Sequence, residues 1–157
     1  MQSGGSANPT TNSTLEALFR AEYVGMVRLA FTLVGDATEA EDLVQDAFVE
    51  VSRRLDEIRR PGAYLRQAVV SRCRSSLRRR RLLERRPPPR PEAASAEVDE
   101  FWDVLDVLSE DRRIAVVLRF YLNLRASEIA EVMGVSSSTV RSHLRRALAT
   151  LREELDR

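Results

Sequence analysis

The sequence predicts an all-α protein made of two small helical domains. Apolar residues recur at intervals of three and four along most of the chain, which is the spacing of one helix face, and no stretch alternates as a strand does. Glycine and proline interrupt this pattern at Gly35, Pro61 and Gly134, where a helix can end or begin. A length of 157 residues suits one domain or two small ones and excludes a large multidomain enzyme.

The first helix is expected to run from Leu15 to the first of these glycines. Before it, residues 1–14 are rich in serine, threonine, glycine and asparagine, a composition typical of a disordered tail. A second helix is expected to begin at Thr38, because Glu41 follows three residues later in the spacing of a capping box. Its apolar spacing continues as far as Leu55.

The third helix is expected to begin at Pro61, since the first turn of a helix tolerates proline. It carries one stripe of apolar residues and another of arginines. Residues 85–96 are rich in proline and then in small residues, which favours an extended spacer. We therefore expect a flexible linker there, between a first domain over residues 15–84 and a second over residues 97–157.

The second domain is expected to contain three helices after an apolar stripe that includes Trp102 and Leu108. They run from Glu110 to Leu122 with Ser109 as the cap, from Ser127 to Met133, and from about Ser137 onward. Gly134 and Ser136 predict a tight turn between the last two, because glycine reaches positive φ and serine caps the helix that follows. Two helices joined in this way form a helix-turn-helix.

A helix-turn-helix predicts DNA binding, because the N-terminal part of its second helix enters the major groove. The apolar face of that helix is expected to be buried and consists of Val140, Leu144, Ala147, Leu148 and Leu151. The outer face would reach base edges and phosphates through Thr139, Arg141, Ser142 and Arg145, with Arg146 further along as a phosphate contact. A helical hairpin that only packs, with a solvated arginine face, is the alternative.

Charge is arranged in blocks along the chain, although the net charge is only +1. Residues 1–52 hold two arginines against eight acidic residues, residues 53–90 fourteen against three, residues 91–111 none against eight, and residues 112–157 nine against five. Blocks of one sign indicate separate surfaces for separate partners, with compensation between neighbouring helices as the alternative. We expect the acidic block over residues 91–111 to compete with DNA in the free protein.

Arg78 to Arg81 are four consecutive arginines at the end of the third helix. Like charges three and four residues apart each cost roughly 0.2–0.5 kcal/mol, so this helix end is expected to fray unless a polyanion such as nucleic acid neutralises it. The alternative is a solvated charge run that leads into the linker.

Residues that commonly carry catalysis or bind metals are scarce. Cys73 and His143 are the single cysteine and the single histidine, and each lies within a helical repeat, so we expect no enzyme, no metal and no cofactor. The apolar runs are far shorter than the roughly 20 residues that span a bilayer. The first residues also lack the pattern of a secretion signal. We therefore expect a cytoplasmic protein without membrane insertion.

The segment Ala40–Phe48, with the sequence AEDLVQDAF, closely resembles region 2.2 of bacterial sigma factors, which docks on core RNA polymerase. Residues 61–65 and 69–81 resemble regions 2.3 and 2.4, and Leu108–Leu155 resembles region 4. The order of these segments, over nearly the whole chain, is similar to that of a two-domain extracytoplasmic-function (ECF) sigma factor of the actinobacterial SigE-like subfamily.

The resemblance implies a sigma factor that binds core RNA polymerase and promoter DNA, and it leaves an anti-sigma factor open as a further partner. The first domain would recognise the minus 10 element and the second the minus 35 element. By resemblance, Asp42, Gln45 and Asp46 lie on the polymerase-docking face; Ser71, Arg74 and Arg78 lie on the DNA face of the first domain; and Ser138, Thr139, Arg141, Ser142 and Arg145 lie in the recognition helix. Many family members carry asparagine at the position of Ser71 and arginine at that of His143.

Two other functions remain open at this stage. Residues 139–144, with the sequence TVRSHL, are also similar to LuxR-type DNA-binding domains, which would make the chain a dimeric operator-binding regulator. Such a regulator normally carries a receiver or ligand-sensing domain, and the first half of the sequence shows none. The third possibility is a helical adaptor that binds only proteins, which promoter-specific DNA binding would exclude.

Overall fold

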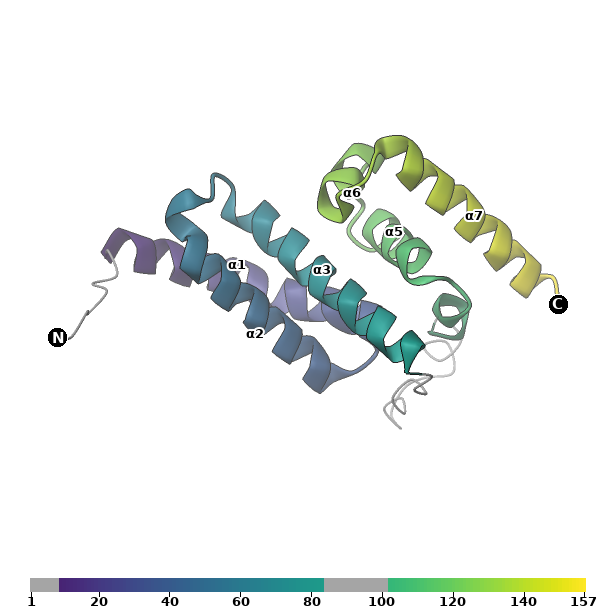
Figure 1. Ribbon diagram of the computed structural model, residues 1–157, viewed down its shortest axis with the longest axis horizontal. Coiled ribbons are helices and arrows are strands. Elements are labelled where there is room, and N and C mark those ends of the chain that lie inside the picture. Colours follow the sequence, from purple (N-terminus) through teal and green to yellow (C-terminus); the bar gives the residue numbers. More distant parts are fainter. Residues whose placement is uncertain (1–8, 84–101) are drawn as a thin grey trace.

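The computed structural model describes residues 9–83 and 102–157, and every regular element in these two ranges is a helix (Figure 1). The all-α prediction is therefore confirmed for this part of the chain. The elements are α1 (Pro9–Val34), α2 (Ala37–Arg54), the short 3-10 helix η1 (Leu55–Glu57), α3 (Pro61–Leu82), α5 (Glu110–Phe120), α6 (Ala126–Met133) and α7 (Ser137–Leu155). Residues 102–106 form a further helical turn before α5.

α1 begins six residues earlier than the sequence predicted, at Pro9. The expectation of disorder is therefore wrong for residues 9–14, and residues 1–8 lie outside the described residues. Proline fits the first turn of a helix. The Thr14 hydroxyl donates a hydrogen bond of 3.0 Å to the carbonyl oxygen of Thr10, so this polar side chain bonds back to the helix in which it lies.

Gly35 and Asp36 set the turn between α1 and α2. Gly35 has a φ of 77°, and Asp36 is extended with a φ of −127°. The Asp36 side chain accepts a hydrogen bond of 2.9 Å from the backbone N–H of Glu39. The expected cap at Thr38 is therefore wrong, because the left-handed glycine places the extended residue at position 36.

The first three long helices pack on one another, and α5, α6 and α7 form a second unit beside them (Figure 1). α3 contacts both α5 and α6, so it lies at the boundary between the units. Buried side chains of both units form one continuous apolar cluster, which includes Leu33 and Leu65 from the first unit and Ile114 and Ile129 from the second. The predicted linker at residues 85–96 lies outside the described residues.

Trp102 joins the two units directly. Its ring meets that of Phe31 edge-on, with 5.4 Å between the centroids, and its side chain is only 7% exposed. A Cβ atom added at Gly35 would lie 3.9 Å from the same indole ring. The only tryptophan of the chain is therefore buried at the junction of the units.

The second unit follows the predicted order of helices with small differences. Ser109 precedes α5, but its side chain makes no capping hydrogen bond. α5 ends at Phe120, two residues before the expected end. Leu148 is 40% exposed, so the expectation that it is buried is wrong; Val140 and Ala147 of the same helix are fully buried.

The turn between α6 and α7 has the predicted chemistry. Gly134 is left-handed, with φ 68° and ψ 34°, and the backbone N–H of Val135 donates to the carbonyl oxygen of Ala130 at 3.1 Å. Ser136 caps α7 by accepting a hydrogen bond of 3.2 Å from the backbone N–H of Thr139. At the other end of α6, the backbone N–H of Arg125 donates to Glu128, and this bond lowers the pKa of the Glu128 carboxyl.

We expect Asp36→Ala to lower the free energy of unfolding by about 1 kcal/mol, because the N–H of Glu39 loses its acceptor. Thr38→Ala is the matched control and should stay within about 0.5 kcal/mol of the wild type, since Thr38 is exposed and provides no cap. Urea denaturation followed by circular dichroism measures both. Equal destabilisation by the two variants would contradict the assignment of the cap to Asp36.

Gly134→Ala should destabilise the protein by about 1–2 kcal/mol, the backbone cost of a left-handed residue that has a Cβ. No atom lies within 4 Å of the added Cβ, so a steric clash does not contribute. Gly25→Ala serves as the control in the middle of α1, where the added Cβ also meets nothing and the change should stabilise by about 0.5–1 kcal/mol. Thermal unfolding of the two variants should therefore shift in opposite directions.

Candidate nucleic-acid interface

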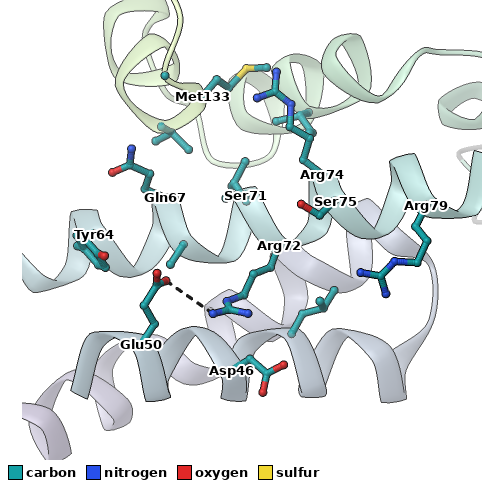
Figure 2. A pocket seen from close by; sticks show the side chains of 16 residues that line it. Asp46, Glu50, Tyr64, Gln67, Ser71, Arg72, Arg74, Ser75, Arg79 and Met133 are labelled. Carbon is teal, nitrogen blue, oxygen red and sulfur yellow. Dashed lines mark ion pairs between the residues drawn. The ribbon is translucent and has the colours of Figure 1, made fainter. Parts of the chain in front are cut away.

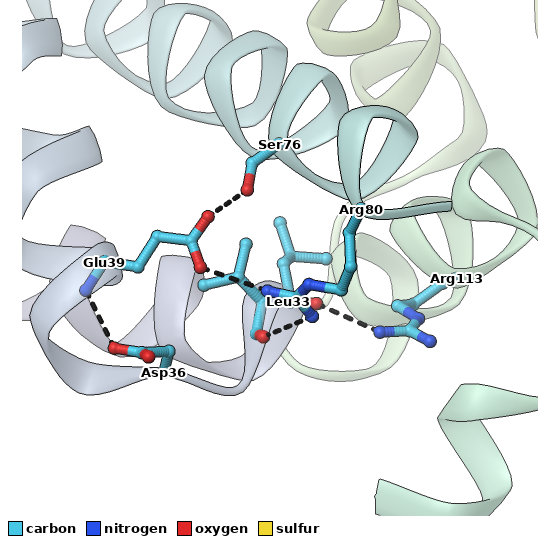
Figure 3. A network of polar contacts seen from close by, with 7 residues as sticks. Leu33, Asp36, Glu39, Ser76, Arg80 and Arg113 are labelled. Atoms are coloured by element: carbon cyan, nitrogen blue, oxygen red, sulfur yellow. Dashed lines mark hydrogen bonds and ion pairs between the residues drawn. The ribbon is translucent and has the colours of Figure 1, made fainter. Parts of the chain in front are cut away.

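The arginines of α3 between positions 74 and 81 divide into those that form ion pairs and those that form none with a described residue. Arg80 points inward, where it donates to the carbonyl oxygen of Val34 at 2.9 Å and to Glu39 at 3.0 Å (Figure 3). Arg74 pairs with Asp111 at 2.7 Å, and Arg81 pairs with Glu110 at 3.1 Å. Arg78 and Arg79 are exposed and form no ion pair with any described residue.

These contacts contradict the expectation that the C-terminal end of α3 frays without a polyanion. α3 stays helical through Leu82. Two of the four consecutive arginines, Arg80 and Arg81, are neutralised by Glu39 and Glu110. The prediction of fraying is therefore wrong, because it counted repulsion within the helix and left out the carboxylates of α2 and α5.

A second arginine, which comes from the other unit, forms a hydrogen bond with the C-terminal end of α1. Arg113 of α5 donates to the carbonyl oxygen of Leu33 at 3.2 Å (Figure 3). It also pairs with Asp106 at 3.1 Å. Its side chain is buried, and this desolvation lowers the pKa of the guanidinium, which the carboxylate of Asp106 partly counteracts. Ser76 donates a hydrogen bond to Glu39 and completes the network on the side of α3.

The predicted DNA face of the first unit faces the second unit. Figure 2 shows Gln67, Ser71 and Arg74 on the side of α3 that is turned toward Met133 of α6. The groove between them has a volume of about 640 Å³ and extends on its other side to Asp46 and Glu50 of α2. Ser71 is exposed at this groove, whereas Arg74 is half-buried and already paired.

The predicted polymerase-docking residues Asp42, Gln45 and Asp46 all lie exposed on α2. The opposite face of that helix is buried in the core through Val44, Ala47 and Val51. Neither Asp42 nor Asp46 forms an ion pair with another described residue. The structure therefore places three adjacent polar side chains, two of them acidic, on one open surface.

The outer face of α7 carries the predicted recognition residues. Arg141, Arg145 and Arg146 are exposed, and within the described ranges none of them forms an ion pair. The hydroxyls of Ser138 and Thr139 lie 3.1 and 2.9 Å from that of Ser136, so they belong to the cap of the helix. Ser142 is half-buried. The guanidinium groups are consequently the most accessible donors on this helix.

The surroundings of Arg146 differ from those of Arg141 and Arg145. It lines a cavity of about 230 Å³ between the units, together with Arg78, Arg112 and His143. Sequence reasoning did not bring Arg112 into any site, because it is separated by more than thirty positions from Arg78 and from Arg146. No local signal in the sequence marked it, because the cavity forms only where α3, α5 and α7 come together.

Cys73 is fully buried in α3, and this burial raises the pKa of its thiol to about 12, with the charge of Glu39 adding to the effect. Its thiolate is therefore unavailable at neutral pH. Among residues 9–83 and 102–157, no three histidine, cysteine or carboxylate side chains gather as a metal site. No helix within these ranges has the length and hydropathy of a membrane span.

Comparison with known proteins agrees with this arrangement. Residues 18–82 match the family described as Sigma-70 region 2, and residues 99–151 match the family described as Sigma-70, region 4. The chain is 37% identical over 152 residues to the RNA polymerase sigma-E factor of Streptomyces avermitilis, an alignment that covers 90% of this chain and 84% of the relative.

Two solved structures share the fold. CnrH, solved in complex with the cytosolic domain of CnrY, superposes with a TM-score of 0.72 at 25% identity, covering 96% of this chain and 91% of CnrH. The sigma factor RpoE from Bartonella quintana, solved in complex with the anti-sigma factor NepR, superposes with a TM-score of 0.70 at 23% identity, covering 95% and 98% of the two chains. The chain thus belongs to the sigma-70 family of RNA polymerase sigma factors and is of the ECF type.

Proposed function

We propose that the chain docks on core RNA polymerase through α2 and directs it to promoters through α3 and α7. The observation that carries this proposal is the separation of charge between exposed surfaces. Asp42, Gln45 and Asp46 form an open acidic face on one helix, whereas Arg141 and Arg145 form an open basic face on another. An acidic face suits a protein partner with basic groups, and the basic face of a helix-turn-helix suits DNA.

In this function, α3 contacts the minus 10 element through Ser71, Arg74 and Arg78. α7 contacts the minus 35 element. Arg141 lies nearer the start of α7 and would read base edges, while Arg146 would hold phosphate. Ser138, Thr139, Ser142 and Arg145 belong to the same interface. The chain acts by binding, in the cytoplasm, and brings no chemistry of its own to the polymerase.

A LuxR-type regulator is less well supported, because the first unit matches sigma region 2 and is a bundle of helices without a sensing domain among its described residues. An anti-sigma factor is a further proposed partner, and the groove of about 640 Å³ beside α2, α3 and α6 offers it a surface. Run-off transcription with core polymerase on a cognate promoter tests the main proposal. Absence of any promoter-dependent transcript would overturn it.

The double substitution Asp42→Arg and Asp46→Arg should weaken core binding by several kcal/mol, because it places like charges across the proposed interface. Both residues are exposed, so the circular dichroism spectrum and the urea midpoint should stay unchanged. A pull-down with core polymerase measures the binding. The pair Glu153→Arg and Asp156→Arg, at the C-terminal end of α7 and directly after it, makes the same charge change elsewhere and should bind normally. Normal binding by the α2 variant would contradict the docking assignment.

Arg141→Ala should flatten the preference for one base in the upstream promoter element by about 1–3 kcal/mol, the discrimination of a bidentate contact to guanine. Arg146→Ala should weaken binding to all sequences alike and lower the salt slope by about one. Binding of the reconstituted holoenzyme to promoter variants across a salt series separates the two effects. An unchanged base preference in Arg141→Ala would show that α7 is oriented differently in the groove.

A further inference from the structure

A small cavity with a basic lining lies where α3, α5 and α7 come together. Its volume is about 230 Å³, and each of the three helices contributes one of the arginines Arg78, Arg112 and Arg146 to its wall. None of these three guanidinium groups forms an ion pair with a described residue. The fold therefore gathers three positive charges around one small space, although like charges repel.

Two carboxylates also line the cavity, but another arginine already neutralises each of them. Glu110 pairs with Arg81 at 3.1 Å, and Asp111 pairs with Arg74 at 2.7 Å. Arg81 belongs to the wall of the cavity, whereas Arg74 neutralises Asp111 from outside it. The two ion pairs leave the three arginines of the preceding paragraph without a counter-charge from the lining.

The start of α5 adds neutral donors to the same wall. Ser109 lines the cavity, and its side chain makes no capping hydrogen bond, so its hydroxyl is available to a ligand. The backbone N–H of Arg113 is the first that bonds within the helix, to the carbonyl oxygen of Ser109. The N–H groups of residues 110–112 have no acceptor in the helix and carry its partial positive charge. His143 of α7 offers a ring nitrogen nearby.

These donors suit a phosphate group. Guanidinium groups and backbone N–H groups are the usual protein ligands of phosphate, and the several oxygens of a phosphate can each accept from an arginine of a different helix. At about 30 Å³ per water molecule, the cavity has room for about seven of them. It is smaller than the roughly 300–1,000 Å³ of pockets that enclose drug-sized ligands. One or two phosphate groups fit this space, whereas a whole nucleotide does not.

We propose that this cavity binds a free phosphate anion of the size of inorganic phosphate or pyrophosphate. The site itself does not depend on the proposed function. Within that function, Arg78 and Arg146 are also assigned to promoter DNA, so the bound anion and DNA compete for the same two side chains. Arg112 is assigned neither to DNA nor to polymerase, and it therefore separates the two roles. The phosphodiesters of DNA share the chemistry of the anion, and the test distinguishes the two sources.

Isothermal titration calorimetry of the full chain with inorganic pyrophosphate measures the site, at low salt and without polymerase, DNA or divalent cations. We expect saturable binding to a single site. Arg112→Gln should weaken this binding by about tenfold or more, because a half-buried guanidinium loses its charge-assisted hydrogen bond to the anion. Arg112→Lys keeps the charge and should retain part of the affinity.

Arg152→Gln is the matched control, because it removes the same charge from an exposed position of α7 outside the lining of the cavity. It should bind pyrophosphate as the wild type does. Arg112 forms no ion pair with a described residue, so the circular dichroism spectrum and the urea midpoint of Arg112→Gln should stay close to those of the wild type.

A competition measurement distinguishes the free anion from the DNA backbone. Saturating pyrophosphate should weaken binding of the polymerase-free chain to a short duplex, and chloride at the same ionic strength should weaken it less. Without pyrophosphate, Arg112→Gln should bind the duplex as well as Arg152→Gln does. With pyrophosphate, Arg112→Gln should lose the part of the competition that exceeds the effect of chloride.

Absence of saturable pyrophosphate binding in the wild type would overturn the proposal, and so would equal binding by the wild type and Arg112→Gln. Loss of duplex affinity in Arg112→Gln beyond that of Arg152→Gln would also overturn it, because the cavity would then hold a phosphate of the DNA backbone. Run-off transcription stays an independent readout. If pyrophosphate binds through Arg112 but no promoter-dependent transcript forms with core polymerase, the proposed function fails and the anion site stands.

Discussion

The C-terminal end of α1 needs hydrogen-bond donors, and the way it obtains them organises the whole molecule. The last carbonyl groups of a helix have no partner within the helix, and burial makes that lack costly. Arg80 of α3 donates a hydrogen bond to the carbonyl oxygen of Val34, and Arg113 of α5 donates one to the carbonyl oxygen of Leu33. One arginine comes from each unit, so the bundle of α1, α2 and α3 and the attachment of α5 depend on the same helix end.

This constraint explains why two positive charges lie close together in a buried place. The partial negative charge of the helix end attracts both guanidinium groups, and Glu39 and Asp106 each neutralise one of them. Asp36 contributes indirectly, because its bond to the N–H of Glu39 fixes the start of α2, from which the Glu39 side chain reaches Arg80. The turn at Gly35 therefore positions a cap, a carboxylate and the packing surface of Trp102 within a few residues.

Much of this fold could be predicted from the sequence, because amphipathic spacing and turn chemistry are local. The first residues of α3 and α7 and the left-handed Gly134 follow from such signals. The cap at Asp36 was missed, since Thr38 offered a competing pattern.

The inward turn of Arg80 could not be predicted from a run of four arginines, because its partners lie more than forty positions away. The exposed faces of α2 and α7 were predictable, whereas the pairing of Arg74 with Asp111 required the docking of two units. The ion pairs of Arg74 with Asp111 and of Arg80 with Glu39 confirm compensation between neighbouring helices, whereas separate surfaces for separate partners stay a prediction.

The burial of Cys73 protects its thiol from reagents that modify exposed cysteines. Burial raises the pKa of this thiol to about 12, so the reactive thiolate is nearly absent at neutral pH, and the side chain has no access to solvent. Oxidants and maleimide reagents should therefore leave the native chain unmodified. Cysteines introduced on the surface of the two units could be labelled selectively with fluorophores while the natural one stays in place.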